Sequence, residues 1–313
     1  MKALKTGYRV SLIVLASAVL GFGEMNSAAP RVGGPNMALP GTVNYVEGQV
    51  SLDNRPLANT GKIAIAPGQT LSTGNGFAEV LLTPGAFLRL GNNSQVRLLA
   101  TGLAQTSAQL DRGSTIVEVD QFIQGTNLAV TMGGANTQIE KKGLYDFGAD
   151  QQSVKVLDGK VNVMTAAGSK TIGKDDQISL ASENPLKKTG FDAKALKAQP
   201  LYVWSEARSR DESQANVAVA ENVASYGGWY GPGWYWNPDL SFYAYLPANG
   251  YFYSPFGWGF YSPLFIRAYG IPFGYYGHYG RSYGAFRGQV GGVSAHAYSF
   301  HGGMAGGFHG GRR

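Results

Sequence analysis

The chain contains no cysteine among its 313 residues. A disulfide framework, a thiolate zinc site and a cysteine nucleophile all require that residue, so the sequence excludes all three. The length still allows one or two domains with a substantial hydrophobic core. We therefore expect stability to come from ordinary packing.

Histidine is also scarce, because the four histidines, His278, His296, His301 and His309, all lie near the C-terminus. The remainder lacks the imidazole that a Ser-His-Asp arrangement needs, and no His-Glu-x-x-His or Gly-x-Ser-x-Gly motif occurs. A flexible histidine tract can bind a transition metal weakly, but no spacing here fixes a coordination geometry. We expect a solvated tract without metal or cofactor.

Two adjacent acidic pairs, Asp175–Asp176 and Asp211–Glu212, are the other candidates for acid–base chemistry. Neighbouring residues on a strand point to opposite faces, so Asp175 and Asp176 cannot act on one substrate there. We interpret these pairs as solvated. The sequence then offers no catalytic residue, and we expect a protein that is not an enzyme.

Charged residues make up only 15% of the chain, and its net charge of +6 belongs to the two ends. Residues 1–29 carry a net +2, residues 30–225 are balanced, and residues 226–313 carry a net +4. Five arginines spread along this last segment are too few to form a nucleic-acid footprint. We therefore expect no nucleic acid among the partners.

The N-terminus has the pattern of a secretory signal over residues 1–29. Lys2, Lys5 and Arg9 precede an apolar run from Val10 to Leu20, and small residues follow at 27–29. The run is shorter than the ~20 residues that a membrane span needs. The alternative is an uncleaved anchor, and either form places the rest outside the cytoplasm, in the periplasm, at the outer membrane surface or outside the cell.

Residues 41–181 alternate apolar and polar residues over short runs that end at turn signals. Phe77–Leu82, Ala86–Leu90 and Ser114–Val119 are examples, separated by Gly, Pro, Asn and Asp. Asp158–Gly159 predicts a two-residue hairpin between alternating runs over residues 153–163. No long amphipathic helix interrupts this region, so the sequence predicts an all-β fold.

The same region resembles the FecR domain family. The resemblance rests on Gly48-Gln-Val-Ser51, Pro67–Gly74, Ala78–Gly85, Leu88–Leu98 and Leu110–Val117, and it continues to Val163. It implies a β-helix-like stack of short strands. The family's prototype passes a signal from an outer-membrane iron-siderophore transporter to a cytoplasmic sigma factor. Here the apolar run begins at Val10, so we expect no room for a cytoplasmic sigma-binding segment.

A helical connector is predicted over residues 190–224. Pro200 suits the first position of a helix near 200–223, and a shorter helix is expected near 192–198. Trp204 lies in the long helix. We expect it to pack the helix on the β-domain rather than to contact a ligand.

Residues 225–313 form a low-complexity tail. From Tyr226 onward there are 27 aromatic residues and 21 glycines. So few aliphatic residues remain that we expect no compact independent fold. We predict that residues 226–265 lie extended against the β-domain as an adhesive segment and that residues 280–313 are disordered.

Together these features predict an exported, non-catalytic envelope protein with a ligand- or protein-binding β-domain. Its expected partners are an envelope protein or polysaccharide, with self-association through the tail. The first alternative is an extracytoplasmic component of a sigma-factor and iron-uptake type of signalling system. The second is an enzyme acting on envelope polysaccharide.

Overall fold

The computed structural model describes residues 37–57, 63–181 and 186–270. The predicted signal over 1–29, the four histidines and the predicted disorder over 280–313 lie outside these residues. In the part of the chain that is described, no helix is long and apolar enough to cross a membrane.

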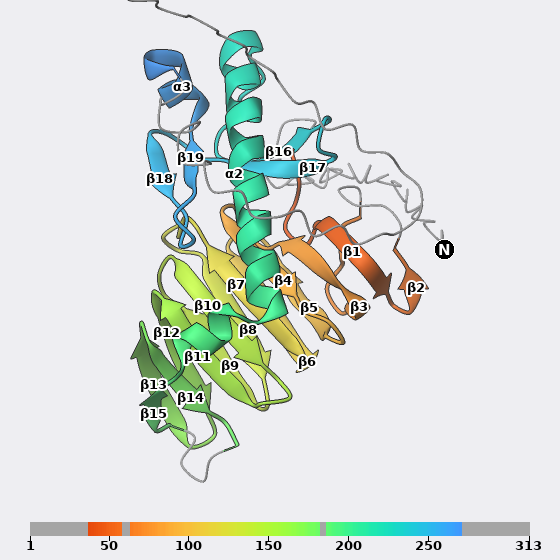
Figure 1. Cartoon of the computed structure of the whole chain (residues 1–313), viewed down its shortest axis with the longest axis vertical. Coiled ribbons are helices and arrows are strands. Elements are labelled where there is room, and N and C mark those ends of the chain that lie inside the picture. The colour runs from red at the N-terminus through yellow and green to blue at the C-terminus, as the bar shows by residue number, and fades with distance from the viewer. Residues whose placement is uncertain (1–36, 58–62, 182–185, 271–313) are drawn as a thin grey trace, which may run out of the picture. The chain divides into compact units, whose positions relative to one another are not determined.

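Strands dominate the described chain up to Gly190 (Figure 1). Fifteen of them join in one sheet. Their bounds are β1 (Val43–Leu52), β2 (Arg55–Pro56), β3 (Thr70–Leu81), β4 (Ala86–Leu90), β5 (Gln95–Thr101), β6 (Gln105–Arg112), β7 (Ser114–Val119), β8 (Asn127–Met132), β9 (Ala135–Ile139), β10 (Gly143–Gly148), β11 (Ser153–Asp158), β12 (Lys160–Thr165), β13 (Gly168–Gly173), β14 (Asp176–Ser179) and β15 (Lys188–Gly190).

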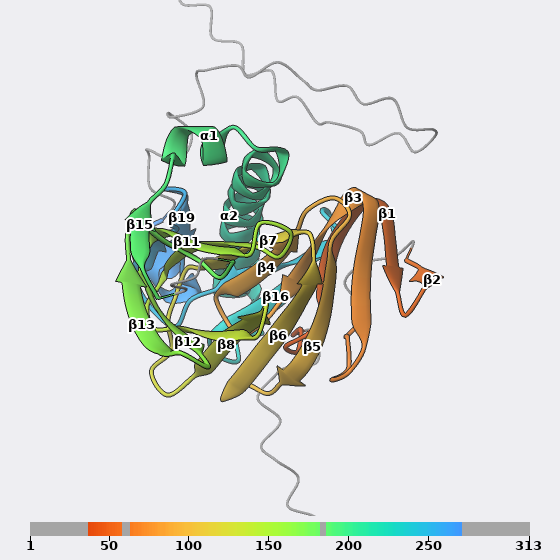
Figure 2. The same ribbon diagram turned by 90° about the horizontal axis from the view of Figure 1, so that it is seen from below.

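The sheet curls back on itself to form two facing walls (Figure 2). One wall runs β4-β7-β10-β11-β14-β15 and the other runs β5-β6-β8-β9-β12-β13. Strand β3 belongs to both, because its residues 78–81 pair with β4 and its residues 70–72 pair with β5. All pairs are antiparallel except β6 with β8. The predicted all-β fold, followed by a helix, is confirmed, and the predicted stack takes the form of this curled sheet.

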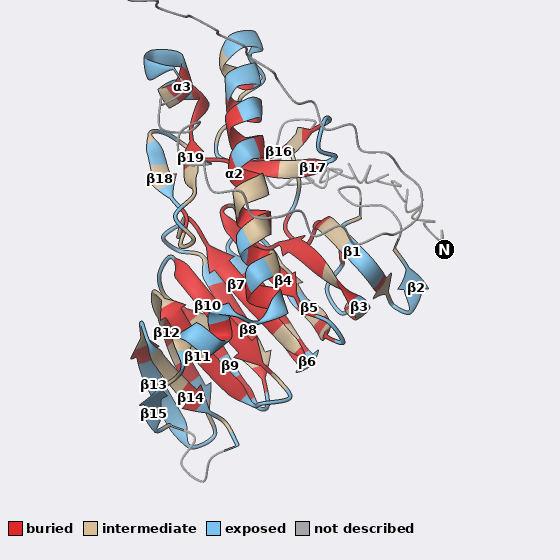
Figure 3. Cartoon of the chain, in the orientation of Figure 1, coloured by how far each residue is buried: buried red, intermediate tan, exposed pale blue. Residues whose placement is uncertain are grey.

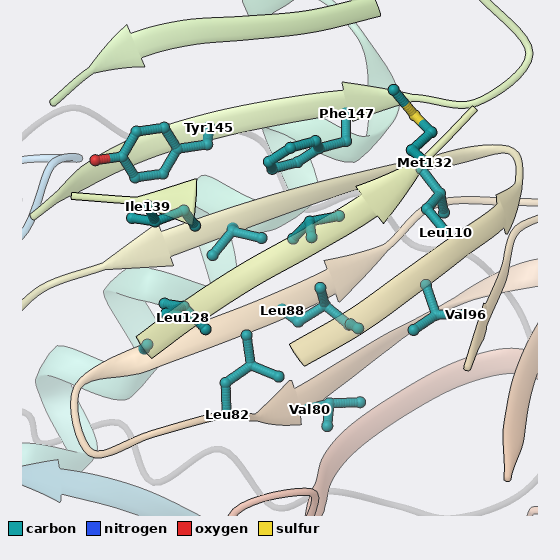
Figure 4. Packing of buried hydrophobic residues seen from close by; sticks show 14 of the residues in the cluster. Val80, Leu82, Leu88, Val96, Leu110, Leu128, Met132, Ile139, Tyr145 and Phe147 are labelled. Carbon is teal, nitrogen blue, oxygen red and sulfur yellow. The ribbon is translucent and has the colours of Figure 1, made fainter. Parts of the chain in front are cut away.

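The hydrophobic core fills the space between the two walls. Figure 4 shows side chains from both walls pointing toward one another, with Leu88, Tyr145 and Phe147 facing Leu110 and Leu128. Each of these five is at most 2% exposed. They lie at alternate positions of their strands, as the period of two in the sequence predicts.

The predicted hairpin at Asp158–Gly159 is wrong. Strand β11 pairs with β10 and β14, whereas β12 pairs with β9 and β13, so the two strands lie in different walls. Gly159 has a φ of +96°, and a Cβ there would collide with the hydroxyl of Tyr145. The glycine therefore forms a sharp corner at which the chain crosses from one wall to the other.

Two helices follow the sheet, as predicted. Helix α1 (Ala193–Lys197) is capped by Asp192, whose carboxylate accepts from the Ala195 N–H at 3.0 Å. Helix α2 (Pro200–Tyr226) begins with proline at its first turn. It lies across the outer face of the wall that contains β4 and β7 (Figures 1 and 2).

Trp204 packs α2 on the β-domain, which confirms the expectation from the sequence. Its ring stacks on Phe77 of β3 with centroids 5.0 Å apart, and its indole N–H donates to Glu47 of β1 at 2.8 Å.

The aromatic segment after α2 lies against the β-domain, as predicted for residues 226–265, but the prediction that it is extended is wrong, because it is folded as far as Gly270. It forms a hairpin of β16 (Gly233–Asn237) with β17 (Phe242–Leu246), a second of β18 (Tyr251–Tyr253) with β19 (Gly259–Tyr261), and α3 (Pro263–Tyr269). Trp234, Tyr245 and Phe260 are at most 1% exposed and pack with residues of β3 and β4. Large rings supply the buried area that the missing aliphatic residues would otherwise give.

Candidate functional site

We call the wall that begins with strands β4 and β7 and continues to β15 the β4–β7 wall; β5 and β6 lie in the opposite wall. Its outer face carries charged side chains beneath α2. Glu79 of β3 and Arg89 of β4 are cross-strand neighbours, and Arg89 Nε lies 2.7 Å from Glu79 Oε2. The same guanidinium donates from Nη1 to Glu118 of β7. All three side chains are 0% exposed. Arg89 therefore bridges two carboxylates that belong to strands on either side of it.

Helix α2 adds a second cation and another acid to this face. Arg208 and Glu212 are one turn apart, and Arg208 Nη2 lies 3.0 Å from Glu212 Oε1 and 2.8 Å from Glu79 Oε1. The guanidinium also lies over two rings, 4.3 Å from the centroid of Tyr45 and 4.4 Å from that of Phe242. Arg208 thus joins the helix to the sheet.

Two uncharged side chains complete the network. Asn44 of β1 donates through Nδ2 to Glu79 Oε1 at 3.0 Å and to Glu212 Oε1 at 2.7 Å. Its Oδ1 accepts from the Tyr243 N–H at 2.8 Å, which fixes β17 to the same point. Ser209 Oγ donates to Glu118 Oε1 at 2.7 Å. Four parts of the chain meet here: β1, the β4–β7 wall, α2 and the first aromatic hairpin.

We call the ionisable members of this network the buried charge cluster. They are Glu79, Arg89, Glu118, Asp120, Arg208 and Glu212, and none is more than 4% exposed. Burial opposes ionisation of Glu79, but Arg208 and Arg89 outweigh it and lower the pKa of that carboxyl to about 2. Burial together with Glu118 raises the pKa of Asp120, and burial together with Glu79 raises that of Glu212.

The buried charge cluster joins α2 to the sheet and has no surface that a substrate could reach. Glu212 is buried, so the interpretation of Asp211–Glu212 as a solvated pair is wrong for that residue. The reason is its place on the face of α2 that covers the sheet. Asp175 does lie exposed in a turn, with a φ of +65°, while Asp176 pairs with Lys188 at 3.0 Å. Within the described ranges, no group of histidine and acidic residues is arranged to hold a metal ion.

A second feature lies where the two walls of the sheet fail to close. In the described chain, β13 pairs with β12 alone and β15 pairs with β14 alone, so each leaves one edge unpaired. We call these two edges, residues 168–173 and 188–190, the open seam. Residues 168–171 and all of β15 are exposed, which Figure 3 shows in pale blue. Four exposed lysines lie at or beside it: Lys170, Lys174, Lys187 and Lys188.

The backbone of β13 offers hydrogen-bonding groups to the open seam. In an antiparallel ladder, alternate residues direct their N–H and C=O groups away from the partner strand. The Gly173 N–H donates to Asp176 Oδ2 at 3.1 Å and not across to β12. Thr171 and Ser169, two and four residues before it, therefore also direct their backbone groups to the unpaired edge.

The pattern of the sequence shows the face on which the charges lie but not their burial. Glu79, Arg89 and Glu118 occupy the polar phase of three adjacent strands, which normally marks a solvated face. The usable signal was the opposite charge at neighbouring positions, together with Arg208 and Glu212 four residues apart on the helix. Nothing local shows that the helix covers those strands.

The fold is thus a curled, mainly antiparallel sheet with one long helix packed across the outer face of one wall. Residues 69–162 match the model of the family described as FecR protein, which confirms the resemblance found in the sequence. The match runs from β3 into β12, so it includes the sheet half of the buried charge cluster but not α2.

Two crystal structures of a candidate anti-sigma factor from Parabacteroides distasonis are similar to the chain. They share 19% and 18% identity with it, each with a TM-score of 0.36, and the alignments cover 41% of this chain. The chain spans 62% and 63% of their lengths, which is less than two thirds of each. Among curated proteins, no sequence matches.

Proposed function

We propose that the chain is an extracytoplasmic component of a signalling system of the sigma-factor and iron-uptake type, and that it acts by binding proteins. The FecR family match over residues 69–162 carries this proposal, and it favours signalling over a general envelope-binding role. The pattern of a secretory signal over residues 1–29 supports a place outside the cytoplasm. A membrane partner then carries the cytoplasmic part of the pathway.

The open seam is the docking surface in this proposal. An extended segment of a partner can add a strand to β13, because Ser169 and Thr171 present unpaired backbone groups there. Lysines are common on protected edges, where they discourage aggregation, and they also select for the charge of a partner. With Lys170, Lys174 and Lys187 exposed, the seam suits an acidic segment.

A second role, self-association, is favoured by exposed aromatic residues close to Gly270. Tyr251, Tyr253 and Tyr269 are 53%, 57% and 78% exposed. The segment that follows, residues 271–313, contains nine more aromatic residues. This role is tested by sedimentation of the full chain against a Tyr251→Ser/Tyr253→Ser variant, for which we expect weaker association.

The signalling role is tested by deleting the gene and measuring transcripts. We expect a coherent set of sigma-factor-dependent transcripts to change, and the wild-type gene to restore them. An unchanged transcript set would overturn the proposal.

The docking surface is tested by complementing the same deletion with edge variants. Thr171→Pro removes one backbone donor from the open seam, so we expect it to fail to restore the transcripts. Thr171→Val, which keeps the backbone donor and the β-branched shape, is the matched control and should restore them. Restoration by Thr171→Pro, from folded protein of normal abundance, would rule out docking at β13.

A further inference from the structure

The buried charge cluster holds more acids than bases. Four carboxyl groups, those of Glu79, Glu118, Asp120 and Glu212, face two guanidinium groups, with no member more than 4% exposed. An unpaired charge in such a place is strongly unfavourable. If all four acids were ionised, the cluster would hold two uncompensated negative charges. Two bound protons make it neutral.

The geometry indicates where these two protons are. Among the described residues, no N–H or O–H group donates to either carboxyl oxygen of Asp120 or to Glu212 Oε2. Asp120 follows Glu118 by two residues at the end of β7, and the two carboxyls interact. Glu212 Oε1 and Glu79 Oε1 accept from the same Asn44 Nδ2 and lie beside the same Arg208 Nη2. One proton on Asp120 and one on Glu212 give each acid pair a hydrogen bond, which satisfies two of the three unpaired oxygens.

We infer that the contact between α2 and the sheet is a proton-dependent latch, which holds while Asp120 and Glu212 are protonated and loosens α2 when they are ionised. This goes beyond the proposed signalling role and does not depend on it.

The groups that face the cluster do not supply the missing positive charge. Those on the packed elements are Tyr45 of β1, Tyr202 and Asp211 of α2, and Tyr245 of β17. The three phenols are neutral near pH 7, because burial raises each pKa. Asp211 adds negative charge at the rim, 3.9 Å from Arg208.

The direction of the pH effect follows from linkage. Asp120 and Glu212 have pKa values raised above the usual 3.8 and 4.5, so the latched state binds protons that the open state releases. The stabilisation is complete below those usual values and is lost as the pH rises through the raised ones. In that interval the equilibrium constant for opening of α2 away from the sheet should increase by about tenfold per pH unit for each retained proton.

The test is hydrogen exchange of the full chain, measured from about pH 5 to about pH 9 and corrected for the intrinsic exchange rate. Protection of α2 residues 201–216 should fall with increasing pH by about tenfold per unit or more, while the core strands β4 and β10 stay protected. The Asp120→Asn/Glu212→Gln variant, which is uncharged at these positions, should lose most of this slope. The surface variant Asp111→Asn is the control and should keep it.

An equal slope in the wild type and the double variant would overturn the latch. If the double variant does not fold, infrared spectroscopy of the wild type in heavy water decides the question. We expect a C=O band of protonated carboxylic acid at neutral pH, and its disappearance at the pH at which α2 loses protection. Absence of that band at neutral pH overturns the inference.

Discussion

Along β4 and β7 both faces of the wall are buried, but charged side chains lie only on the outer face, where they alternate with apolar ones such as Phe87 and Ile116. The inner face presents apolar residues such as Leu88 and Val117 to the opposite wall. The outer face presents Arg89 and Glu118 to a helix that begins only at Pro200, far along the chain. The period of two decides which side chains share a face, whereas burial of the outer face depends on a distant element.

The largest expected effect comes from breaking the outer face at Arg89. Arg89→Leu leaves Glu79 and Glu118 without their shared cation in a site closed to water, so we expect a loss of about 4 kcal/mol in the free energy of unfolding. Urea denaturation measures it. Arg97→Leu is the matched control, because Arg97 is 43% exposed and pairs with Asp111 at 3.1 Å. Its expected cost is below about 1 kcal/mol, and equal costs would mean that burial of Arg89 has no energetic consequence.

The inner face responds to a change of volume rather than of charge. Leu88→Ala leaves a cavity between the walls, with an expected loss of about 3 kcal/mol. This loss should be the same at every pH at which the protein folds, because the Leu88 side chain lies in the apolar core between the walls. A loss that varied with pH would show that the two faces are coupled through β4.

Alternation was sufficient to predict the inner face, and hence the all-β fold, from residues such as Leu88 and Val117. It failed at Asp158–Gly159, because turn chemistry describes a local reversal and cannot distinguish a hairpin from a corner between walls. The prediction for Trp234 and Tyr245 rested on composition instead, and it failed because composition does not show that their rings pack on β3 and β4. Glu212 was misjudged for the same reason: its burial is a property of the packed helix.

The outer face should also respond to acid, whereas the inner face should not. The folded-state pKa of Glu79 is about 2, below its usual 4.5, so its stabilisation is present above pH 4.5 and is lost as the pH falls through about 2. Between about pH 4.5 and about pH 3 we expect a loss of roughly 2 kcal/mol. Urea titrations of the wild type and Glu79→Gln give the measurement. The variant should be less stable near neutral pH and should lose less free energy of unfolding over this interval. An equal loss in both proteins would contradict the assignment of this pH dependence to Glu79.

One amide of α2, that of Asn216, is bonded to both aromatic hairpins. Asn216 Nδ2 donates to the carbonyl oxygens of Tyr245 at 2.7 Å and Tyr261 at 3.0 Å, and its Oδ1 accepts from the Tyr261 N–H at 2.8 Å. Asn216→Ala leaves these buried backbone groups unpaired, at an expected cost of about 1–2 kcal/mol. Hydrogen exchange should locate the loosening in β17 and β19. The exposed Asn222→Ala is the control, and loosening confined to the β4–β7 wall would refute this role of Asn216.

The smallest effect is expected at the open seam, where residues 168–171 and 188–190 are exposed. Lys188 Nζ pairs with Asp176 Oδ2 at 3.0 Å, but the lysine side chain is 53% exposed. Solvent and salt screen such a pair, so Lys188→Ala should change the free energy of unfolding by less than about 1 kcal/mol. A small cost here agrees with the docking surface that we propose, and it contrasts with the large cost expected on the outer face beneath α2. Denaturation at low and high salt measures it, and a loss as large as that of Arg89→Leu would mean that the seam is part of the folded core.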